Sequence, residues 1–558
     1  MITTRATDLT SLLLVLACSH SSAVVVPASV SPSAAPAPVT DPAAPSPRDS
    51  GPGAAPAPAA EVPRQTPARA AASVAELPRA RPVVSAGLDA RSCTVNVGDA
   101  LQPALNAAKG GDVLCLTRGA TYRGNFVVPA RRDTGFVVLR SAPAVTLGTG
   151  RMRPSTAAGL ARLASGNTNS TLKFVARAAR WHVLGVEITS DSALVQGPVA
   201  LVEVGTGREQ VRDDLPDGIS FDRVYIHGWS HQHVRRAFSA NGGAFTLTRS
   251  WCAEIHASGF DSQCVISWAG AGPMLIEDNH LAAASENLMF GGGDPRVPGL
   301  VTADVTIRRN HITKPLSWKG QHWNVKNLIE TKSSARVLVE ENVLDGTWTD
   351  GQTGYAFVMK STTQGGTCKP CSTSDWTIRR NLIRHTGAGF SIAGRADQHA
   401  TGVTDSTNRR LQISENWIEP LSVPPYPGDA RPVLFLDGNQ DVSFTRNVFE
   451  PSPRIREAIL SDISGPNKEA VRNLTLSGNV FPRGEYGVGA SAVGEGARAW
   501  RAGALGRSTW GRNAFIGATT IAYPPGTTWH STLAQALGAA GLSRAAVDAG
   551  VAGVVVAP

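Results

Sequence analysis

Charged side chains of both signs recur in the middle of the chain, at positions that align when its internal repeats are superposed. Asn287 and Asn327 then share one column on adjacent units, and Lys332 lies two units before Arg395. The charged residues brought to one face are Glu286, Asp294, Lys326, Glu330, Lys332 and Lys360. Lysines beside carboxylates can bind an acidic sugar and transfer a proton during its cleavage. The same pattern is typical of a solvated ladder of alternating charges, which stabilises stacked strands modestly.

Carboxylate pairs in this region could instead perform glycoside hydrolysis, which needs two carboxyl groups about 5–9.5 Å apart. Glu286 with Asp294, or Asp261 with Glu286, could supply the pair, because strands of adjacent units lie about 4.8 Å apart. The spacing does not select one pair. A flat apolar ring suits the C–H face of a sugar, and single tryptophans also anchor loops. The candidate stacking platforms are Trp268, Trp318, Trp323 and Trp348.

A short phrase recurs through the chain: an apolar residue, two polar residues, usually Asn, any residue, and an apolar residue. One complete copy is Ile276–Leu281, and three earlier copies replace the Asn. The Asn positions are 279, 310, 342, 381, 416, 447 and 479, spaced by 31 to 39 residues. Self-similarity at such a period indicates a solenoid, a propeller or an array.

Each unit contains short strands, because β-branched and polar residues alternate between Gly or Asn turns. Two or three strands per unit with variable loops predict an all-β protein, a parallel β-helix. An Asn at the same corner of each coil can hydrogen-bond the Asn above it and tolerates a left-handed backbone. We predict about ten coils over residues 91–510, with a helix near residues 100–109 as the N-terminal lid.

Composition sets the limits of the folded part. At 558 residues the chain exceeds the usual single-core limit of about 250–300 residues, which a solenoid escapes because each coil buries its neighbour. Residues 24–90 are dominated by Ala, Pro, Val and Ser and are expected to form a disordered linker. Residues 511–558 lose the Asn phrase and are expected to form a closing coil, a cap and a loose tail.

The net charge of +9 favours a polyanionic partner. No nucleic-acid-binding motif is present, and the aromatic residues are not interleaved with basic clusters. An acidic polysaccharide is therefore the expected partner, and nucleic acid is not. We expect the chain to act as a monomer.

The N-terminus has the pattern of an export signal, residues 1–23. A short apolar run, Leu12–Ala17, follows Arg5 and is too short to span a membrane. Cys18 after this run resembles a bacterial lipobox, in which that Cys receives a lipid. We expect export, either as a secreted protein or as a cell-envelope lipoprotein, with a lipid anchor as the one contact with a membrane.

The six remaining cysteines fall into pairs that are local in the sequence. An even number of Cys in an exported protein indicates disulfides. The expected pairs are Cys93 with Cys115, Cys252 with Cys264, and Cys368 with Cys371. No further Cys or His stands at ligand spacing near the last pair, so a zinc site is not predicted.

Two stretches resemble known proteins. Residues 93–128 are similar to the entry of the pectate-lyase-like right-handed β-helix, with a "Gly-Asp-apolar" strand at Gly111 after the helix that caps the open end. Residues 217–400 resemble a group of bacterial exported right-handed parallel β-helix proteins whose activity is not established, through Ser285–Pro295 and Trp323–Lys332. The resemblance covers most of the folded chain and implies its fold.

The phrase Ile329–Ser334 also resembles a motif of the alginate lyase and chondroitinase B family, which shares this fold. In that family a Lys removes the proton next to a uronate carboxylate, and calcium neutralises the carboxylate. The resemblance implies that Lys332 is the base.

Other positions of that family's site are not reproduced here. The carboxylates that hold calcium correspond to Val325 and Asn327, so calcium is possible but no intact metal site is recognised. The family's Arg on the next coil corresponds roughly to Met359 or Lys360.

The sequence therefore predicts an extracytoplasmic carbohydrate-active protein that binds an acidic polysaccharide and could cleave it by β-elimination. The candidate catalytic residues are Lys332, Lys360 and Arg395. The candidate substrate-binding residues are Glu286, Asn287, Asp294, Lys326, Asn327, Glu330, Trp318 and Trp323. Two alternatives stay open, a non-catalytic envelope or surface scaffold and a glycoside hydrolase with paired carboxylates, because a fold does not fix a function.

Overall fold

The computed structural model describes residues 74–83, 87–131, 133–142, 147–395, 407–464 and 468–556. The chain divides into two units, residues 1–68 and 69–558, and the described residues lie in the second. The expected signal sequence with Cys18, and residues 24–73 of the expected linker, lie outside the described residues.

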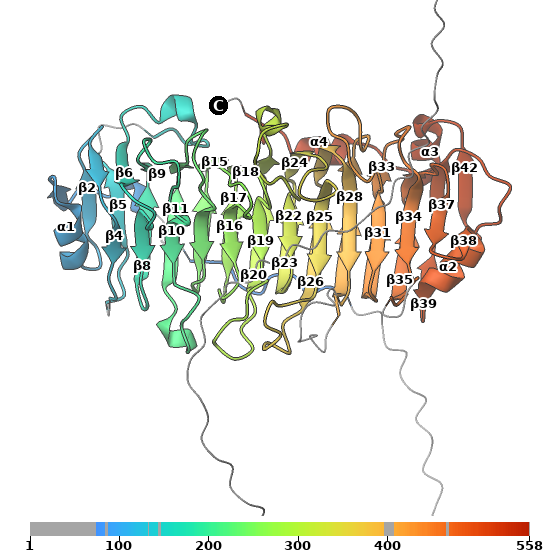
Figure 1. Ribbon diagram of the computed structural model, residues 1–558, viewed down its shortest axis with the longest axis horizontal. Helices are drawn as coiled ribbons and strands as arrows, with labels where there is room; N and C mark the ends of the chain where they lie inside the picture. The colour runs from blue at the N-terminus through green and yellow to red at the C-terminus, as the bar shows by residue number, and fades with distance from the viewer. Residues whose placement is uncertain are drawn as a thin grey trace, which may run out of the picture. The chain divides into compact units, whose positions relative to one another are not determined.

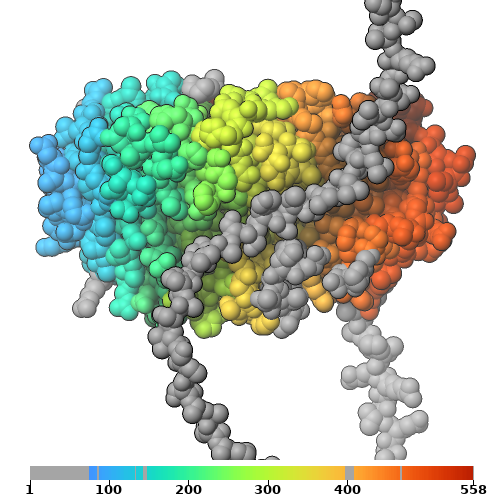
Figure 2. All heavy atoms as spheres, viewed as in Figure 1, coloured from blue at the N-terminus to red at the C-terminus, as the bar shows by residue number. Residues whose placement is uncertain are grey.

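The second unit is a right-handed parallel β-helix, as the sequence predicted. Each turn of the chain contributes one strand to each of three sheets, and the next turn lays its strands beside the previous ones (Figure 1). The coils stack in one continuous series from the N-terminal to the C-terminal end (Figure 2). Strands β2 to β37 form twelve complete coils of three strands, against the ten or so predicted. The first coils lack the Asn phrase, which is why the sequence undercounted them.

The three sheets are named A, B and C, and their strands follow. Sheet A contains β1 (Val95–Val97), β2 (Val113–Leu116), β5 (Val137–Ser141), β8 (Ala179–Leu184), β11 (Asp217–Asp222), β14 (Phe245–Thr248), β17 (Met274–Glu277), β20 (Ala303–Arg308), β23 (Ser334–Glu340), β26 (Thr373–Arg379), β29 (Arg409–Ser414), β32 (Gln440–Thr445), β35 (Val471–Ser477), β39 (Ala504–Leu505) and β40 (Thr509–Trp510). Sheet B contains β3 (Thr121–Arg123), β6 (Ala161–Ser165), β9 (Val186–Ser190), β12 (Tyr225–His227), β15 (Trp251–Ile255), β18 (His280–Ala283), β21 (His311–Thr313), β24 (Val343–Thr347), β27 (Leu382–Thr386), β30 (Trp417–Ile418), β33 (Val448–Phe449), β36 (Val480–Pro482), β41 (Asn513–Ile516) and β42 (Thr527–His530). Sheet C contains β4 (Phe126–Val128), β7 (Leu172–Phe174), β10 (Ala200–Val204), β13 (Arg236–Ala240), β16 (Gln263–Ser267), β19 (Leu288–Phe290), β22 (Ile329–Thr331), β25 (Tyr355–Lys360), β28 (Ala388–Ala393), β31 (Val433–Leu436), β34 (Glu457–Asp462), β37 (Gly487–Ala490) and β38 (Gly494–Glu495).

The helices are short and lie at the ends or in loops. They are α1 (Leu101–Ala107), α2 (Ala497–Gly503), α3 (Leu533–Ala540), α4 (Ala545–Gly550) and the 3-10 turns η1 (Leu88–Ala90), η2 (Pro154–Thr156), η3 (Arg212–Asp214) and η4 (Leu316–Trp318). Helix α1 is the predicted lid, because its Leu101 and Leu105 are buried against the first coils. At the other end Trp500 of α2 packs on the core. None of the described helices is long and apolar enough to cross a membrane.

The apolar ends of the recurring phrase stack in the core. Ile276 pairs with Ile307 in sheet A, and Ile307 pairs with Val339. Leu281 pairs with Ile312 in sheet B. All five side chains are fully buried, which stabilises the fold by about 1.5–3 kcal/mol per side chain. Identical positions on each coil thus build one continuous core.

The recurring Asn side chains form a buried ladder at the corner between sheets A and B. Asn279 Nδ2 donates to Asn310 Oδ1 over 3.0 Å, and Asn310 Nδ2 donates to Asn342 Oδ1 over 3.0 Å. The ladder continues through Asn381, Asn416, Asn447, Asn479 and Asn513. The left-handed residue is the one before the Asn, such as Asp278 with a φ of 58°. The Asn is therefore required for its hydrogen bonds and not, as the sequence suggested, for its own backbone angle.

A segment outside the coils packs on sheet A, so the folded part begins earlier than the boundary predicted from the sequence. In the expected linker, the backbone N–H groups of Glu76 and Arg79 donate to Asp375 and Asp304 of sheet A over 3.2 and 2.9 Å. Residues 74–83 therefore contact the solenoid.

The C-terminal segment also packs on the coils, so the expected loose tail is wrong. Val547 and Val554 pack in a cluster with Val343 and Leu382 on the outside of sheet B. The Arg309 guanidinium donates to the Gly550 carbonyl over 2.7 Å. The tail therefore runs back over sheet B and covers apolar side chains that would otherwise face water.

The three predicted disulfides are present. They are Cys93–Cys115, Cys252–Cys264 and Cys368–Cys371. Cys252 on β15 and Cys264 on β16 belong to the core, so this bridge ties two sheets together inside one coil. Local pairs of this kind suit a solenoid, because residues close in sequence stay on one coil.

Candidate functional site

Six charged residues gather on four successive coils at one edge of sheet C. We call Asp261, Glu286, Lys326, Glu330, Lys332 and Lys360 the Lys–Glu cluster. Asp261 precedes β16, Glu286 precedes β19, Glu330 lies in β22 and Lys360 ends β25. Five of the six were predicted to share a face, and Asp261 had been considered as a partner for Glu286.

Strand register explains why Glu330 lies at the centre. It is the middle residue of β22, and its neighbour Ile329 belongs to the core. Because side chains alternate along a strand, Glu330 takes the outer face. It pairs in register with Met289 of β19 and Val358 of β25, so the residues that flank β22 are carried onto the same face.

The cluster is held by ion pairs between its lysines and carboxylates. Lys326 Nζ lies 2.5 Å from Asp261 Oδ1 and 3.5 Å from Glu286 Oε1. Lys332 Nζ lies 3.5 Å from Glu330 Oε1, and Lys360 Nζ lies 4.0 Å from the same atom. At these two distances from Glu330, the ammonium groups of Lys332 and Lys360 can still bind a further anion.

Burial separates the charges into two layers. The Glu286 and Glu330 side chains are 1% exposed, whereas those of Lys326, Lys332 and Lys360 are 17, 22 and 29% exposed. The carboxylates lie beneath and the ammonium groups reach water. A ligand approaching this face meets positive charge first.

Burial makes Glu286 an unusual carboxyl group. Loss of solvent raises its pKa to about 7, and the charges of Glu330 and Asp261 act in the same direction. Lys326 and a 2.8 Å hydrogen bond from Gln263 Nε2 oppose the rise. Glu286 can therefore gain and lose a proton near neutral pH.

A lysine that acts as a base at neutral pH needs a lowered pKa, whereas two lysines of the cluster have raised pKa values. Burial alone would lower the pKa of Lys332, but the charges of Glu330, Glu286 and Asp261 outweigh it and raise the pKa. The pKa of Lys326 is raised for the same reason. Both groups are therefore ammonium ions at neutral pH, which suits binding of an anion, and Lys332 loses its proton only in alkaline solution.

The two predicted asparagines differ in what they can offer a ligand. Asn327 Nδ2 donates to Glu330 Oε2 over 2.5 Å, while its Oδ1 is buried without a partner among the described residues. The Asn287 side chain is fully used, because Nδ2 donates to Leu281 O and Oδ1 accepts from Lys314 Nζ over 2.7 Å. Asn287 therefore supports the turn and does not face the ligand.

Lys314 is a buried residue that the sequence did not reveal. Its Nζ also donates to the Ala283 and Ser285 carbonyls over 3.0 and 2.5 Å, directly under the turn that carries Glu286. Burial holds its pKa well below the ordinary value. A single Lys in a loop has no pattern that predicts this role.

Two of the predicted charged site residues lie outside the cluster. Asp294 accepts hydrogen bonds from the backbone N–H groups of Gly365, Thr367 and Cys368, so it fixes the loop that holds the third disulfide. The Arg395 side chain is half exposed, and its Nη1 lies 3.8 Å from Glu469 Oε1. The Asp294 carboxylate is therefore occupied by backbone N–H groups, whereas the charges of Glu330 and Asp261 act on Glu286.

The prediction that Trp318 and Trp323 are sugar-stacking platforms is wrong. Trp318 and Trp323 are 3 and 2% exposed and form a small core with Trp348 and Val325. They anchor the long loop before β22, so their ring faces are not available to a sugar. Trp268 alone of the four candidates is partly exposed.

A metal site does not accompany the cluster in the part of the chain described. The carboxylates of the cluster are paired with ammonium groups. The one close His/carboxylate set among the described residues is Asp89, His182 and Asp222. Asp222 is ion-paired with Arg223 and Arg249, so arginines already supply the positive charge.

No protein-family model and no curated protein matches the chain. Among solved structures it is similar to the PL6 family alginate lyase AlyGC, at 13% identity and a TM-score of 0.44, covering 78% of this chain and 53% of that one. It is also similar to the catalytic domain of a GH87 alpha-1,3-glucanase, at 12% identity and a TM-score of 0.41, covering 82% and 68%. For the Dettilon tailspike protein the values are 14%, 0.36, 75% and 60%. The chain spans about half the length of that lyase, and likenesses at this level assign no activity to it.

Proposed function

We propose that the protein is an extracytoplasmic carbohydrate-active protein that binds an acidic polysaccharide on sheet C, at the Lys–Glu cluster. The observation that carries this proposal is the layer of partly exposed ammonium groups over two buried carboxylates. Three cations on two adjacent coils, Lys326 and Lys332 beside β22 and Lys360 at the end of β25, can attract the carboxylates of an acidic polymer. Three disulfides are in keeping with an oxidising compartment.

The same groups can perform β-elimination of a uronic-acid polymer. Lys326 and Lys360 would neutralise the uronate carboxylate, which makes the adjacent C–H proton more acidic. Lys332 would remove that proton in its deprotonated form. The proton passes to Lys332, the electrons of the C–H bond form the C=C bond, and the glycosidic oxygen leaves with a proton from solvent.

A second reaction is favoured by one observation. Glu286 has a pKa of about 7, which the charge of Glu330 helps to raise, and the two resemble the general acid and the carboxylate of a glycoside hydrolase. This pair replaces the pair of Glu286 with Asp294 that the sequence suggested.

A panel of polysaccharides tests these functions on the full chain. It should contain polygalacturonate, alginate and a glycosaminoglycan, with neutral dextran as control. Absorbance of unsaturated uronate indicates elimination, and reducing ends without absorbance indicate hydrolysis. Binding with neither signal indicates a non-catalytic scaffold. Equal binding of dextran and the acidic polymers, or no binding at all, would contradict the proposal.

Binding of an acidic polysaccharide is expected to weaken as the pH rises from about 6 to about 8. Below its pKa of about 7, Glu286 is neutral and the three lysines outnumber the ionised carboxylates of the cluster. Above it the ionised Glu286 cancels this excess, and we expect the affinity to fall roughly threefold to tenfold. Calorimetry at several pH values measures the effect.

Glu286→Gln is expected to remove this pH dependence and to hold the affinity at its low-pH value. Glu277→Gln is a matched control, because Glu277 lies on the same coil but pairs with Arg308 on sheet A. A slope that persists in Glu286→Gln would assign the titration to another group.

A further inference from the structure

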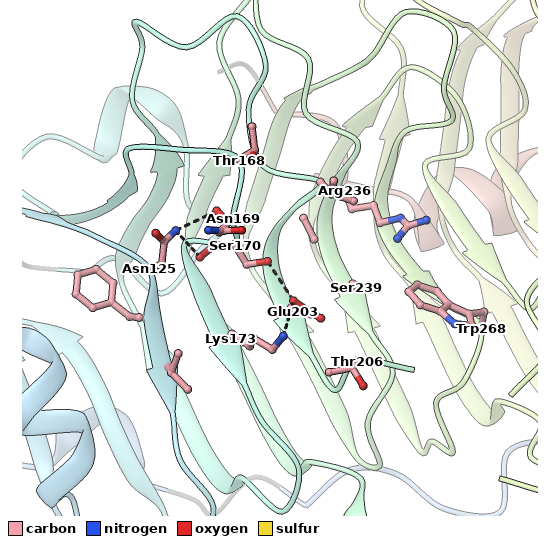
Figure 3. A pocket seen from close by; sticks show the side chains of 14 residues that line it. Asn125, Thr168, Asn169, Ser170, Lys173, Glu203, Thr206, Arg236, Ser239 and Trp268 are labelled. Carbon is pink, nitrogen blue, oxygen red and sulfur yellow. Dashed lines mark hydrogen bonds and ion pairs between the residues drawn. The ribbon is translucent and has the colours of Figure 1, made fainter. Parts of the chain in front are cut away.

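A groove lies on the outer face of sheet C (Figure 3). Its strands precede those of the Lys–Glu cluster, toward the N-terminal coils. Its volume is about 520 Å³, and it crosses β4, β7, β10 and β13. The side chains that matter below are Asn125, Ser170, Lys173, Glu203, Arg236 and Trp268. The mechanism above uses none of them.

Arg236 is a cation in this groove that the charges of Asp261 and Glu203 attract only from a distance. Among the described residues its guanidinium makes neither a hydrogen bond nor an ion pair, and its Nε is buried without a partner. Burial lowers its pKa to about 10, and the charge of Arg235 acts in the same direction. Burying a charge without a partner costs free energy. A bound anion would remove that cost, and guanidinium matches a carboxylate in a bidentate geometry.

Trp268 supplies a fixed ring beside this cation. The Arg236 Cζ lies 4.9 Å from the centre of the ring, and Figure 3 shows the two side chains next to each other. A Cβ added at Gly207 or Gly293 would lie 2.7 Å from a ring atom, so the two glycines make room for the indole. Unlike the buried Trp318 and Trp323, Trp268 is partly exposed. A sugar can stack on it.

The rest of the groove offers groups for sugar hydroxyls. Lys173 Nζ lies 3.3 Å from Glu203 Oε2, and Ser170 Oγ donates to the same carboxylate over 3.3 Å. The Lys173 and Glu203 side chains are 34 and 24% exposed. These partly exposed donors and acceptors can form hydrogen bonds with sugar hydroxyl groups. The charges of Lys173 and Glu203 cancel each other.

The groove and the cluster are connected through neighbouring strands of sheet C. Arg236 pairs in register with Gln263 of the next strand, and Gln263 Nε2 donates to Glu286. Three strand spacings separate β13 from β22, which is about 14 Å. Several linked sugars span that distance, so one polymer can occupy both places.

We propose that this groove is a second uronate subsite of the same polysaccharide-binding face, in which Arg236 binds the carboxylate and Trp268 stacks on the sugar ring. The subsite rests on the proposed function. Because it lies coils away from Lys332, it contributes to affinity and to the length of chain recognised, and not to the chemical step.

The test compares short and long ligands on the full chain. The probes are a trisaccharide and an octasaccharide of galacturonate or of mannuronate, with the carboxyl-reduced octasaccharide as a neutral probe. Arg236→Gln is expected to weaken octasaccharide binding about tenfold or more and to leave trisaccharide binding unchanged. Arg236→Lys should recover part of the loss. Trp268→Leu should weaken binding of the acidic octasaccharide and of the carboxyl-reduced one.

Arg235→Gln is the matched control. Arg235 also lies over an aromatic ring, that of Phe260 at 4.7 Å, but does not line the groove. Circular dichroism and thermal unfolding establish that each variant is folded. Octasaccharide affinity that is equal in wild type, Arg236→Gln and Trp268→Leu overturns the subsite while the proposed function stands. Failure of the wild type to bind any oligouronate overturns the proposed function, and the subsite with it.

Discussion

Replacing Lys332 by alanine is expected to lower the rate of β-elimination by roughly 10²- to 10⁴-fold, which is the contribution of a general base. Binding should weaken much less, because Lys326 and Lys360 still present ammonium groups on the same face. Lys332→Arg keeps the charge but not the ability to lose a proton. It should therefore retain binding and lack activity. Absorbance of unsaturated uronate measures the rate.

The pH profile gives this prediction a second readout. The charges of Glu330, Glu286 and Asp261 raise the pKa of Lys332 above its ordinary value of 10.5. The fraction of neutral Lys332 therefore increases with pH up to that pKa, and the rate of elimination is expected to rise into the alkaline range. Lys109→Ala is the control, since Lys109 is exposed and far along the chain from the cluster.

Two results would contradict the role of Lys332. One is elimination that Lys332→Arg still performs, which would assign proton removal to another group. The other is a rate that peaks near neutral pH and is lost in Glu286→Gln, which would make Glu286 the group that moves the proton. In either case the binding proposal would stand on its own measurements.

The fold could be predicted because the repeat is written in residues that stack on themselves. Ile276, Ile307 and Val339 take equivalent positions on consecutive coils. Such a column of apolar side chains is buried when the coils stack, because each side chain then covers the next. The phrase at Trp510–Phe515 was overlooked because its Gly511 interrupts the pattern, although Asn513 completes the ladder.

The site could be predicted only where strands set the register. Glu330 and Lys332 lie on or beside β22, and counting along the repeat placed them next to Lys360 correctly. Asp294 and Trp323 lie in loops, whose length varies from coil to coil and whose course no period describes. Those loops fold into their own small cores and clasps, so their polar and aromatic residues have structural partners that the sequence pattern does not reveal.

The same limit applies to what packs on the outside of the coils. The segment of residues 74–83 has the composition of its neighbours in the expected linker, yet Asp304 and Asp375 accept hydrogen bonds from its backbone. Backbone groups have no signature in the sequence. Only the acceptors on the coil decide where such a segment binds.

Replacing Asn381 by leucine is expected to lower the free energy of unfolding by roughly 4 kcal/mol or more. Asn381 lies in the middle of the ladder and is fully buried. Its Oδ1 accepts from the backbone N–H and from the Nδ2 of Asn342 over 3.0 and 2.9 Å, and its Nδ2 donates to the Val339 carbonyl over 3.0 Å. Leucine has a similar volume but removes these partners from the Asn342 backbone N–H and the Val339 carbonyl, and each buried group that loses its hydrogen bond costs about 1–3 kcal/mol. Asn342 Nδ2 keeps its bonds to the Ile307 and Glu340 carbonyls.

Position along the ladder provides the matched comparison. Asn513 is the last rung and accepts from Asn479 on one side only. Because a solenoid is stabilised by contacts between neighbouring coils, Asn513→Leu should release only the end coil, while Asn381→Leu uncouples the two halves. Denaturant unfolding should then show two transitions for Asn381→Leu and one for the wild type. Asn106→Ala, on the exposed side of α1, should have no effect. Equal destabilisation by all three changes would mean that the ladder does not couple the coils.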